Sequence, residues 1–473
     1  MKQRAYALDA LRGYAIITMV LSATVVAGIL PEWMYHAQTP PPTHAYQPEI
    51  SGLTWVDLVF PFFLFAMGAA LPFSIGSRVE RGERWWKIGL DVVLRFLQLA
   101  FFAIFIQHFY PYVLSSPQDV RSWLLAIGAF AVLFPMFMRF GKVPVWGRVA
   151  IKVAAYGVAV AMLLTTDFAL VEKFSPEFSN IIILILSNVA LFAGVVYLAT
   201  SAKCLKGAER WIRVVLFALL ALLALGADVE GSWAADIMHY SPLWWLLRMD
   251  YLRYLLILLP AIEAGEMLRE SMRSSEAATE HNGQNSRWAA VLAVAAVVLV
   301  VATLAAVQNH HIGLWAVVTF ATLAVMFVAS KRVGGSMGTL WRRLTLLAAV
   351  LMALGILAEP LQGGIKKDPA TLGYLFSTAG LAVAALVALS VTVDYFGWRK
   401  GLAFLWQSGQ NPMVAYVACD LVVYPLLNLT GGIALLGPLY GSPWLGFLHG
   451  VILTSITVLI TMLSTRLKLF WRT

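Results

Sequence analysis

Long apolar runs, separated by short polar stretches, repeat along the whole chain. Many of these runs reach the roughly 20 residues that an α-helix needs to cross a bilayer. The pattern predicts about fourteen membrane-spanning helices, near residues 8–30, 54–75, 88–109, 121–140, 147–166, 179–199, 210–227, 250–268, 287–307, 312–330, 341–359, 370–394, 402–428 and 444–465. The segment 250–268 is the weakest of them because it carries Arg253, Glu263 and Glu266. We therefore expect an all-α, polytopic helical bundle in a membrane, with about 11 to 14 spans.

Composition and charge support this class and add an orientation. The 473 residues are 60% hydrophobic and only 12% charged, which is too apolar for a soluble domain. Of the 34 lysines and arginines, about 27 fall on alternate connections that begin with the N-terminus, and about 6 fall on the intervening ones. We expect both termini to be cytoplasmic. The net charge of +9 is then charge of the inner face, and no nucleic-acid partner is expected.

The chain is expected to form one transmembrane domain in two halves, about residues 1–270 and 288–473. The polar stretch 271–287 lies between them and is expected on the cytoplasmic side. Cys204 and Cys419 fall in different predicted segments, so no disulfide framework is expected.

Two polar residues lie at the entry to the second predicted span. The loop 31–52 contains no lysine or arginine and follows the first span, so His44 is expected on the non-cytoplasmic side, where its imidazole can act as a base. Asp57 lies about one turn into the next helix, where it could hold the tautomer of that imidazole. Alternatively, His44 is an ordinary loop residue and Asp57 caps the helix by accepting from backbone amides.

Further polar residues lie inside predicted spans. Asn411 could donate a hydrogen bond to a substrate carbonyl, or it could satisfy carbonyl groups freed by a kink at Pro412. Asp420, nine residues further along, could face the same cavity.

Charged residues at helical spacing are expected to pair near the inner interface. Asp9 lies three residues before Arg12, and Asp91 lies four residues before Arg95, so each pair can meet on one helical face. Adjacent histidines, such as those in QNHHIG, point in different directions, and no metal site is expected.

Three blocks of the sequence carry a resemblance to a known family. They are RAYALDALRGYAIITMVLSA (4–23), GLTWVDLVFPFFLFAMG (52–68), and the late pair KKDPATLGYLFSTAGLA (366–382) with QNPMVAYVACDLVVYPLL (410–427). They resemble the heparan-alpha-glucosaminide N-acetyltransferase family and its bacterial relatives. The resemblance implies a bacterial inner-membrane enzyme that moves an acetyl group from cytoplasmic acetyl-CoA to an amino sugar or glycan on the far side.

The resemblance also implies an active histidine in the loop after the first helix. That loop offers His36 and His44, and we favour His44 because it lies closer to Gly52. The lysosomal members carry an asparagine near the end of the first helix, so Ser22 or Thr24 would replace it here.

The resemblance gives further residues a reading as ligand contacts. The phosphates of coenzyme A would bind the arginines near the inner face, which are Arg12, Arg78, Arg81, Arg84 and Arg95. Lys366 and Lys367, on an outer connection, would bind an anionic glycan or lie in solvent, and Asp420 would contact the acceptor.

Two other functions are left open by the sequence. One is an O-acyltransferase acting on an envelope polysaccharide or a lipid-linked sugar. The other is a secondary transporter, in which Asp57, Asp420 and buried arginines form an ion path. The expected partners are acetyl-CoA, the sugar acceptor and the lipid bilayer, with a homodimer left open.

Overall fold

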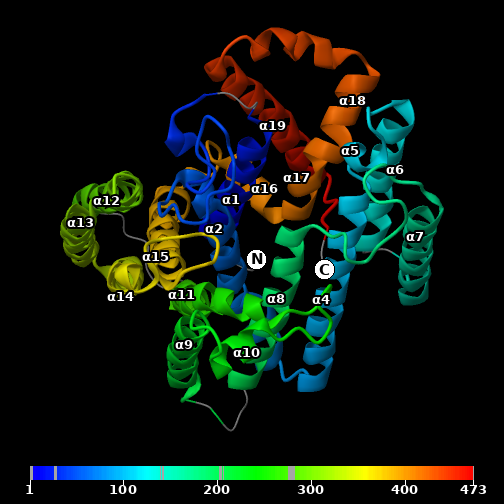
Figure 1. The fold of residues 1–473 in the computed structure, drawn as a ribbon. Coiled ribbons are helices and arrows are strands. Elements are labelled where there is room, and N and C mark those ends of the chain that lie inside the picture. The colour runs from blue at the N-terminus through cyan, green and yellow to red at the C-terminus, as the bar shows by residue number, and fades with distance from the viewer. Residues whose placement is uncertain are drawn as a thin grey trace.

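The computed structural model describes residues 4–25, 29–138, 140, 143–201, 205, 207–274 and 283–471, and within these ranges it contains helices and no strand (Figure 1). The α-helices are α1 (Tyr6–Thr24), α2 (Trp55–Ala69), α3 (Ser77–Glu80), α4 (Trp85–His108), α5 (Pro111–Leu114), α6 (Val120–Phe137), α7 (Val145–Thr165), α8 (Ile181–Thr200), α9 (Glu209–Gly226), α10 (Trp233–His239), α11 (Leu255–Ser274), α12 (Gly283–Gln308), α13 (Ile312–Val333), α14 (Gly335–Ala358), α15 (Leu372–Leu389), α16 (Ala403–Gln410), α17 (Pro412–Ala418), α18 (Tyr424–Leu429) and α19 (Pro443–Arg466). Short 3-10 segments (Glu32–Met34, Met249–Tyr254, Glu359–Gln362 and Gly432–Tyr440) and π-helical segments (Pro72–Gly76, Ser390–Tyr395 and Cys419–Val423) join several of them. The predicted all-α class is confirmed.

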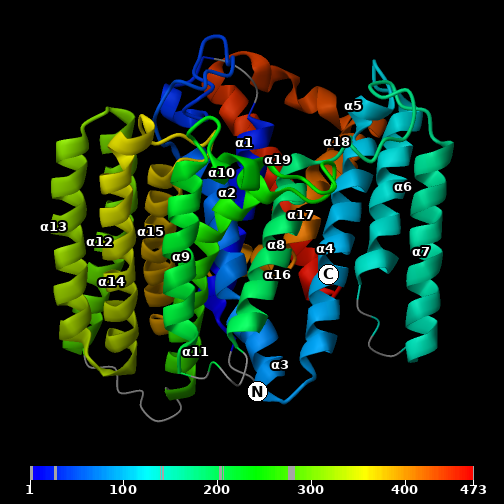
Figure 2. The ribbon, with the colours of Figure 1, turned by 60° about the horizontal axis from the view of Figure 1, so that its bottom comes forward.

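Twelve helices among the described residues are long and apolar enough to cross a membrane. Of the predicted spans, only 210–227 and 250–268 are not among the twelve. Both nevertheless form helices, α9 and α11, which run beside the others (Figure 2). Their charges meet inside the bundle, since Arg213 Nε donates to Glu263 Oε1 at 2.7 Å. Within the hydrocarbon region a charge is tolerated when it finds a partner of this kind.

Some predicted bounds are wrong. The first helix ends at Thr24 rather than near residue 30, and the second continues through a π-helical turn to Glu80. The segment 402–428 is not one helix. It is broken at Asn411, where α16 ends and Pro412 starts α17, because proline has no N–H to continue the helical hydrogen bonds. The middle of the predicted linker, residues 275–282, and Cys204 lie outside the described residues.

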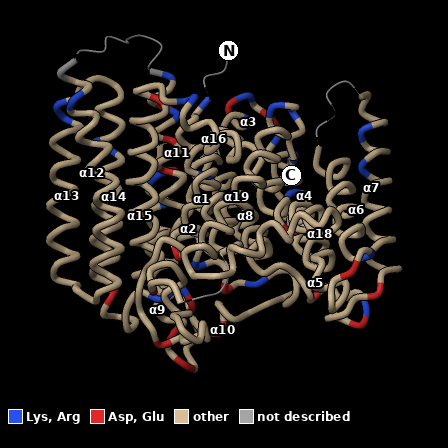
Figure 3. Tube along the Cα trace, turned by 90° about the horizontal axis from the view of Figure 1, so that it is seen from above, with Lys and Arg blue, Asp and Glu red and all other residues tan. Residues whose placement is uncertain are grey.

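The helix ends form two faces. One carries the N-terminus, α3 and the α13–α14 connection at Gly334, and we name it the basic face because many of the lysines and arginines lie there (Figures 2 and 3). The other carries residues 29–54, α5 and α10, and we name it the His36 face. Which face is cytoplasmic remains a prediction from the charge bias.

Helix α1 lies at the centre of the bundle, in contact with α2, α15, α16, α17 and α19. It approaches α16 very closely. A Cβ atom added to Gly13 would lie 1.8 Å from the carbonyl oxygen of Leu405, and one added to Gly409 would lie 1.8 Å from that of Asp9. Small residues that allow backbones to approach are typical of helix packing in membranes. This packing places Arg12 beside the carbonyl oxygen of Gly409, to which its Nη1 donates at 3.2 Å.

Candidate functional site

The start of α2 presents a buried carboxylate at the His36 face. Thr54 is extended and precedes the first helical residue, so that Asp57 falls in the first turn with 2% of its surface exposed. Asp57 Oδ2 accepts from the backbone amides of Thr54 and Ala37, both at 3.1 Å. One oxygen of Asp57 therefore caps the helix entry and ties the preceding loop to it.

The second oxygen of Asp57 holds a histidine. Asp57 Oδ1 lies 2.8 Å from Nδ1 of His36, whose side chain is 39% exposed. A carboxylate at this distance fixes the Nδ1–H tautomer, so that Nε2 keeps its lone pair. Both readings of Asp57 thus apply, as a cap and as the partner of an imidazole, but the imidazole belongs to His36.

Lys367 reaches the same histidine from the connection before α15. Its Nζ lies 3.1 Å from Nδ1 and 3.3 Å from Nε2 of His36. With Nδ1 donating to Asp57, the Lys367 amine is placed to donate to Nε2. His36, Asp57 and Lys367 form one cluster, which we name the His36 cluster.

Hydrogen bonds that involve the backbone of Ile365 and Asp368, which lie on either side of Lys367 in the chain, hold Lys367 in this position. The side-chain amide of Gln38 donates to the carbonyl oxygen of Asp368 at 2.6 Å, and the backbone amide of Asp368 donates back to Gln38 Oε1 at 2.9 Å. The amide of Gly52 donates to the carbonyl oxygen of Ile365 at 2.8 Å. The loop before α2 and the loop before α15 are thereby joined along a seam.

The environment of Lys367 changes its protonation. Burial lowers the pKa of Lys367 from the ordinary 10.5, and the neighbouring carboxylates of Asp57 and Asp368 offset only part of that effect. The neutral form of the Lys367 amine is therefore more highly populated at a given pH than the neutral form of a free lysine. Of the two predicted readings of Lys367, a residue in solvent does not fit this half-buried position.

His44 lies elsewhere in the loop. The chain leaves the site after Gln38 and returns at Gln47, whose amide donates to the carbonyl oxygen of Gln38 at 2.8 Å. His44 lies on this closed excursion and packs its ring against Tyr35, with centroids 4.4 Å apart. The expected pairing of His44 with Asp57 is wrong, because the excursion carries His44 past the site and leaves His36 at its base.

The side-chain amide of Asn411 forms hydrogen bonds with backbone groups of the C-terminal segment. Its Nδ2 donates to the carbonyl oxygen of Leu469 at 2.9 Å, and its Oδ1 accepts from the amide of Trp471 at 3.1 Å. Trp471 is buried against Phe134, with centroids 4.9 Å apart. The predicted interruption at Pro412 is present, but the partners of the Asn411 amide are backbone groups of the C-terminal segment and not carbonyls freed at the kink or a substrate carbonyl.

The predicted phosphate-binding arginines divide into two groups. Arg12 lies inside the bundle, 3.6 Å from Asp9, as its spacing predicted. Arg95 also lies inside, with a buried Nε that has no partner among the described residues. The predicted Asp91–Arg95 pair is wrong, because Asp91 lies 2.7 Å from Arg78 instead.

The other three arginines lie at the α3–α4 corner on the basic face. Arg78 Nε and Arg81 Nη2 donate to Glu83 at 2.7 Å and 2.9 Å, whereas Arg84 is exposed just before α4. The corner therefore presents a cationic surface that is partly neutralised.

Lys366, Asp420 and the residues at the end of α1 lie outside the His36 cluster. Lys366 Nζ lies 3.3 Å from Glu49. Asp420 lies in the π-helical turn after α17, on the side of the bundle that faces α6. Ser22 donates to the carbonyl oxygen of Met19 at 2.9 Å, and Thr24 donates to that of Val20 at 2.9 Å, so each hydroxyl bonds to its own helix.

An apolar cleft lies between the His36 cluster and the interior arginines. Phe60 and Phe63, one and two turns after Asp57, line it from α2. Ile16, one turn after Arg12, and Leu99, one turn after Arg95, line it from α1 and α4. From the His36 face inward, the carboxylate and the imidazole therefore come first, the apolar cleft follows, and the guanidinium groups come last.

These features define a polytopic helical membrane protein with an imidazole, a carboxylate and an amine gathered at one face and cationic groups inside. Among the described residues, no group of three or more His, Cys, Asp and Glu side chains is placed to hold a metal ion.

Comparison of the sequence with known families shows the family to which the chain belongs. Residues 4–268 match the family described as Domain of unknown function (DUF5009). Since the match covers more than half of the 473 residues, the chain belongs to this family. No curated protein matches the sequence.

Proposed function

We propose that this protein is a membrane-bound acyltransferase that moves an acetyl group from acetyl-CoA to an amino sugar or glycan at the His36 face. The observation that carries the proposal is the His36 cluster, in which a carboxylate fixes an imidazole tautomer and an amine lies within hydrogen-bonding distance of the same ring. General bases in acyl transfer are arranged in this way.

The donor would enter from the basic face. Arg12 and Arg95 are the interior cations available to its phosphates, and guanidinium groups bind phosphate strongly. The apolar cleft would take the arm that carries the thioester toward His36. A bacterial inner membrane with the His36 face toward the periplasm is the setting proposed for this arrangement.

The reaction requires one base and one hydrogen-bond donor. In the direct route, His36 Nε2 takes a proton from the acceptor ammonium group, and the amine nitrogen then attacks the thioester carbonyl carbon. A C–N bond forms and the C–S bond breaks. Of the two protons that leave the nitrogen, one ends on the thiolate of CoA and the other passes to solvent. In the covalent route, His36 Nε2 attacks the thioester carbonyl carbon, the C–S bond breaks and CoA leaves as the thiolate, which takes a proton. The acceptor amine then attacks the acetyl group, a C–N bond to the acceptor forms, and the bond from the acetyl group to His36 Nε2 breaks.

Lys367 would turn its amine from His36 Nε2 to the oxyanion that develops on the thioester carbonyl, which leaves Nε2 free to act as the base. This role needs the protonated amine, so activity should persist below the lowered pKa of Lys367 and fall as the pH rises through it. We expect the alkaline limb of the kcat/KM profile to lie below pH 10.5, the ordinary pKa of lysine. Lys367→Arg should remove that limb because a guanidinium stays protonated. Lys367→Met should lower kcat about 100-fold at pH values below that limb, and this variant and the wild type should converge above it. An identical alkaline limb in the wild type and in Lys367→Arg would contradict this role.

The proposal is tested by incubating the purified, detergent-solubilised protein with radiolabelled acetyl-CoA. Glucosamine serves as the amine acceptor, and N-acetylglucosamine serves as the acceptor that offers hydroxyl groups only. Label in glucosamine supports N-acyl transfer, label in both supports O-acyl transfer, and label retained on the protein identifies the covalent route. No turnover of acetyl-CoA with any acceptor would overturn the proposal and make sugar flux in vesicles, the transporter reading, the next measurement.

A further inference from the structure

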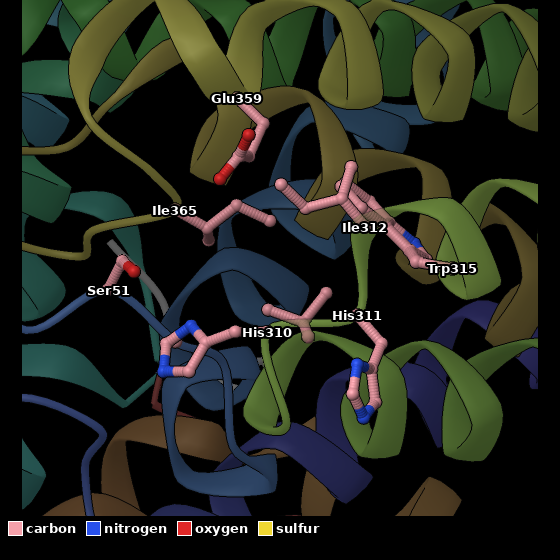
Figure 4. Close-up of a pocket in the computed structure, with 9 residues that line it drawn as sticks. Ser51, His310, His311, Ile312, Trp315, Glu359 and Ile365 are labelled. Carbon is pink, nitrogen blue, oxygen red and sulfur yellow. The ribbon is translucent and has the colours of Figure 1, made fainter.

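A second pocket opens on the His36 face, beside the seam that holds Lys367 (Figure 4). It is an open hollow between the start of α13, the end of α14 and the stretch at Gly52. The Glu359 carboxylate lies on one side of this space, and His310 and His311 lie on the opposite side, as Figure 4 shows.

Two buried polar atoms beside this pocket have no hydrogen-bond partner among the described residues. Trp315, which lines the pocket, is 1% exposed, and its Nε1 is unpartnered. Oε1 of Gln308 is also unpartnered, and it would lie 3.7 Å from a Cβ atom added to Gly52, another lining residue. Buried polar groups in folded proteins are nearly always satisfied, so a donor and an acceptor left open at one pocket point to a polar ligand.

The side chains present define the chemistry of that ligand. A carboxylate, two imidazoles and the hydroxyl of Ser51 can exchange hydrogen bonds with several hydroxyl or amino groups. The indole of Trp315 and the side chain of Ile365 supply flat and apolar surface. A sugar ring, with polar groups at its rim and C–H groups on its faces, matches this combination.

The position of the pocket connects it to the His36 cluster. Ile365 lines the pocket and also accepts the seam hydrogen bond from Gly52 at 2.8 Å. Lys367 follows Ile365 by two residues, which is at most about 7 Å of chain. A glycan with one unit at His36 would therefore have its neighbouring unit beside this pocket.

We propose that the pocket is a second sugar subsite, which binds the unit next to the one that receives the acyl group. The inference rests on the proposed function and deepens it, because it makes the acceptor a chain of at least two linked sugars, at least one of them carrying an amino or hydroxyl group that pairs with Glu359. Trp315 donates from Nε1 to a ring hydroxyl in this arrangement.

The test compares glucosamine with a glucosamine disaccharide as acceptors. Glu359→Gln is expected to raise KM for the disaccharide about tenfold, since one charge-assisted hydrogen bond is weakened, and to leave kcat/KM for the monosaccharide unchanged. Trp315→Phe keeps the aromatic surface but loses the N–H, and it should show the same selective effect. Glu32→Gln removes an exposed carboxylate of the same face and serves as the matched control.

Direct binding separates this inference from the proposed function. Titration calorimetry measures the disaccharide on the purified protein without any donor. Binding in the wild type that weakens in Glu359→Gln supports the subsite even if no acetyl transfer occurs, in which case only the proposed activity fails. Absence of binding, or equal effects of the variants on both acceptors, would overturn the subsite.

Discussion

Replacing His36 by alanine is expected to reduce acetyl transfer by about 100-fold or more, because removal of a positioned general base costs on the order of 10²–10⁴ in rate. Donor binding should be retained, since the arginines proposed for the donor phosphates lie on the other side of the apolar cleft. The measurement is the initial rate of label transfer to glucosamine, together with equilibrium binding of CoA to the same preparation.

The chain offers a matched control for this variant. His44 lies in the same loop but on the excursion, where its ring packs on Tyr35, whereas Asp57 Oδ1 pairs with His36. His44→Ala should keep activity within about threefold of the wild type, a change below 1 kcal/mol in the barrier. Loss of activity in His44→Ala with activity retained in His36→Ala would reverse the assignment of the reactive histidine.

Replacing Gly13 by alanine is expected to destabilise the bundle strongly. The new Cβ atom would lie 1.8 Å from the carbonyl oxygen of Leu405, a backbone atom that cannot rotate away. Helices α1 and α16 must then separate, and overpacking of this kind costs about 1–3 kcal/mol or more. The expected result is a lower midpoint of thermal unfolding in detergent and a reduced yield of monodisperse protein.

A second glycine provides the control. A Cβ atom added to Gly128 in α6 would meet nothing within 4 Å. Gly128→Ala should therefore be neutral or stabilising by about 0.5–1 kcal/mol, because alanine loses less backbone entropy in a helix. Equal stability of the Gly13 and Gly128 variants would show that α1 and α16 pack less closely than described.

The helices could be predicted because each apolar run must be long enough to cross a bilayer. The length of a run can be read from consecutive residues alone. The break before Pro412 could also be predicted, because proline interrupts a helix. The partners of the Asn411 amide could not, since they are Leu469 and Trp471, residues 58 and 60 positions away. Similarly, Asp91 pairs with Arg78 across the α3–α4 corner, whereas helical spacing favoured Arg95.

The candidate site could be predicted in part. Asp57 was identified from its depth in an apolar helix, where a carboxylate needs a partner. Its partner is His36 and not His44, because nearness along the chain does not give nearness in space. The hydrogen bond between Gln47 and Gln38 closes the intervening loop, so these two residues lie side by side although they are nine positions apart in the chain. The run of prolines from Pro40 to Pro42 is the one local sign of such an excursion, since prolines interrupt regular structure.

The neighbours of His36 in the late part of the chain could not be inferred from spacing at all. Lys367 is 331 residues from His36, and only the seam formed by Gln38 and Asp368 brings them together. The pocket at Glu359 and Trp315 could not be inferred from spacing either, because its residues come from three separate connections.

The seam between the loop before α2 and the loop before α15 also affects when the His36 cluster can assemble. Gln38 emerges during synthesis long before Asp368, 330 residues later, so the first helices must wait in the membrane without their partner loop. Contacts between such distant segments form late in folding. A partly synthesised chain therefore lacks the assembled lysine–histidine pair, which forms only when both halves of the bundle are in place.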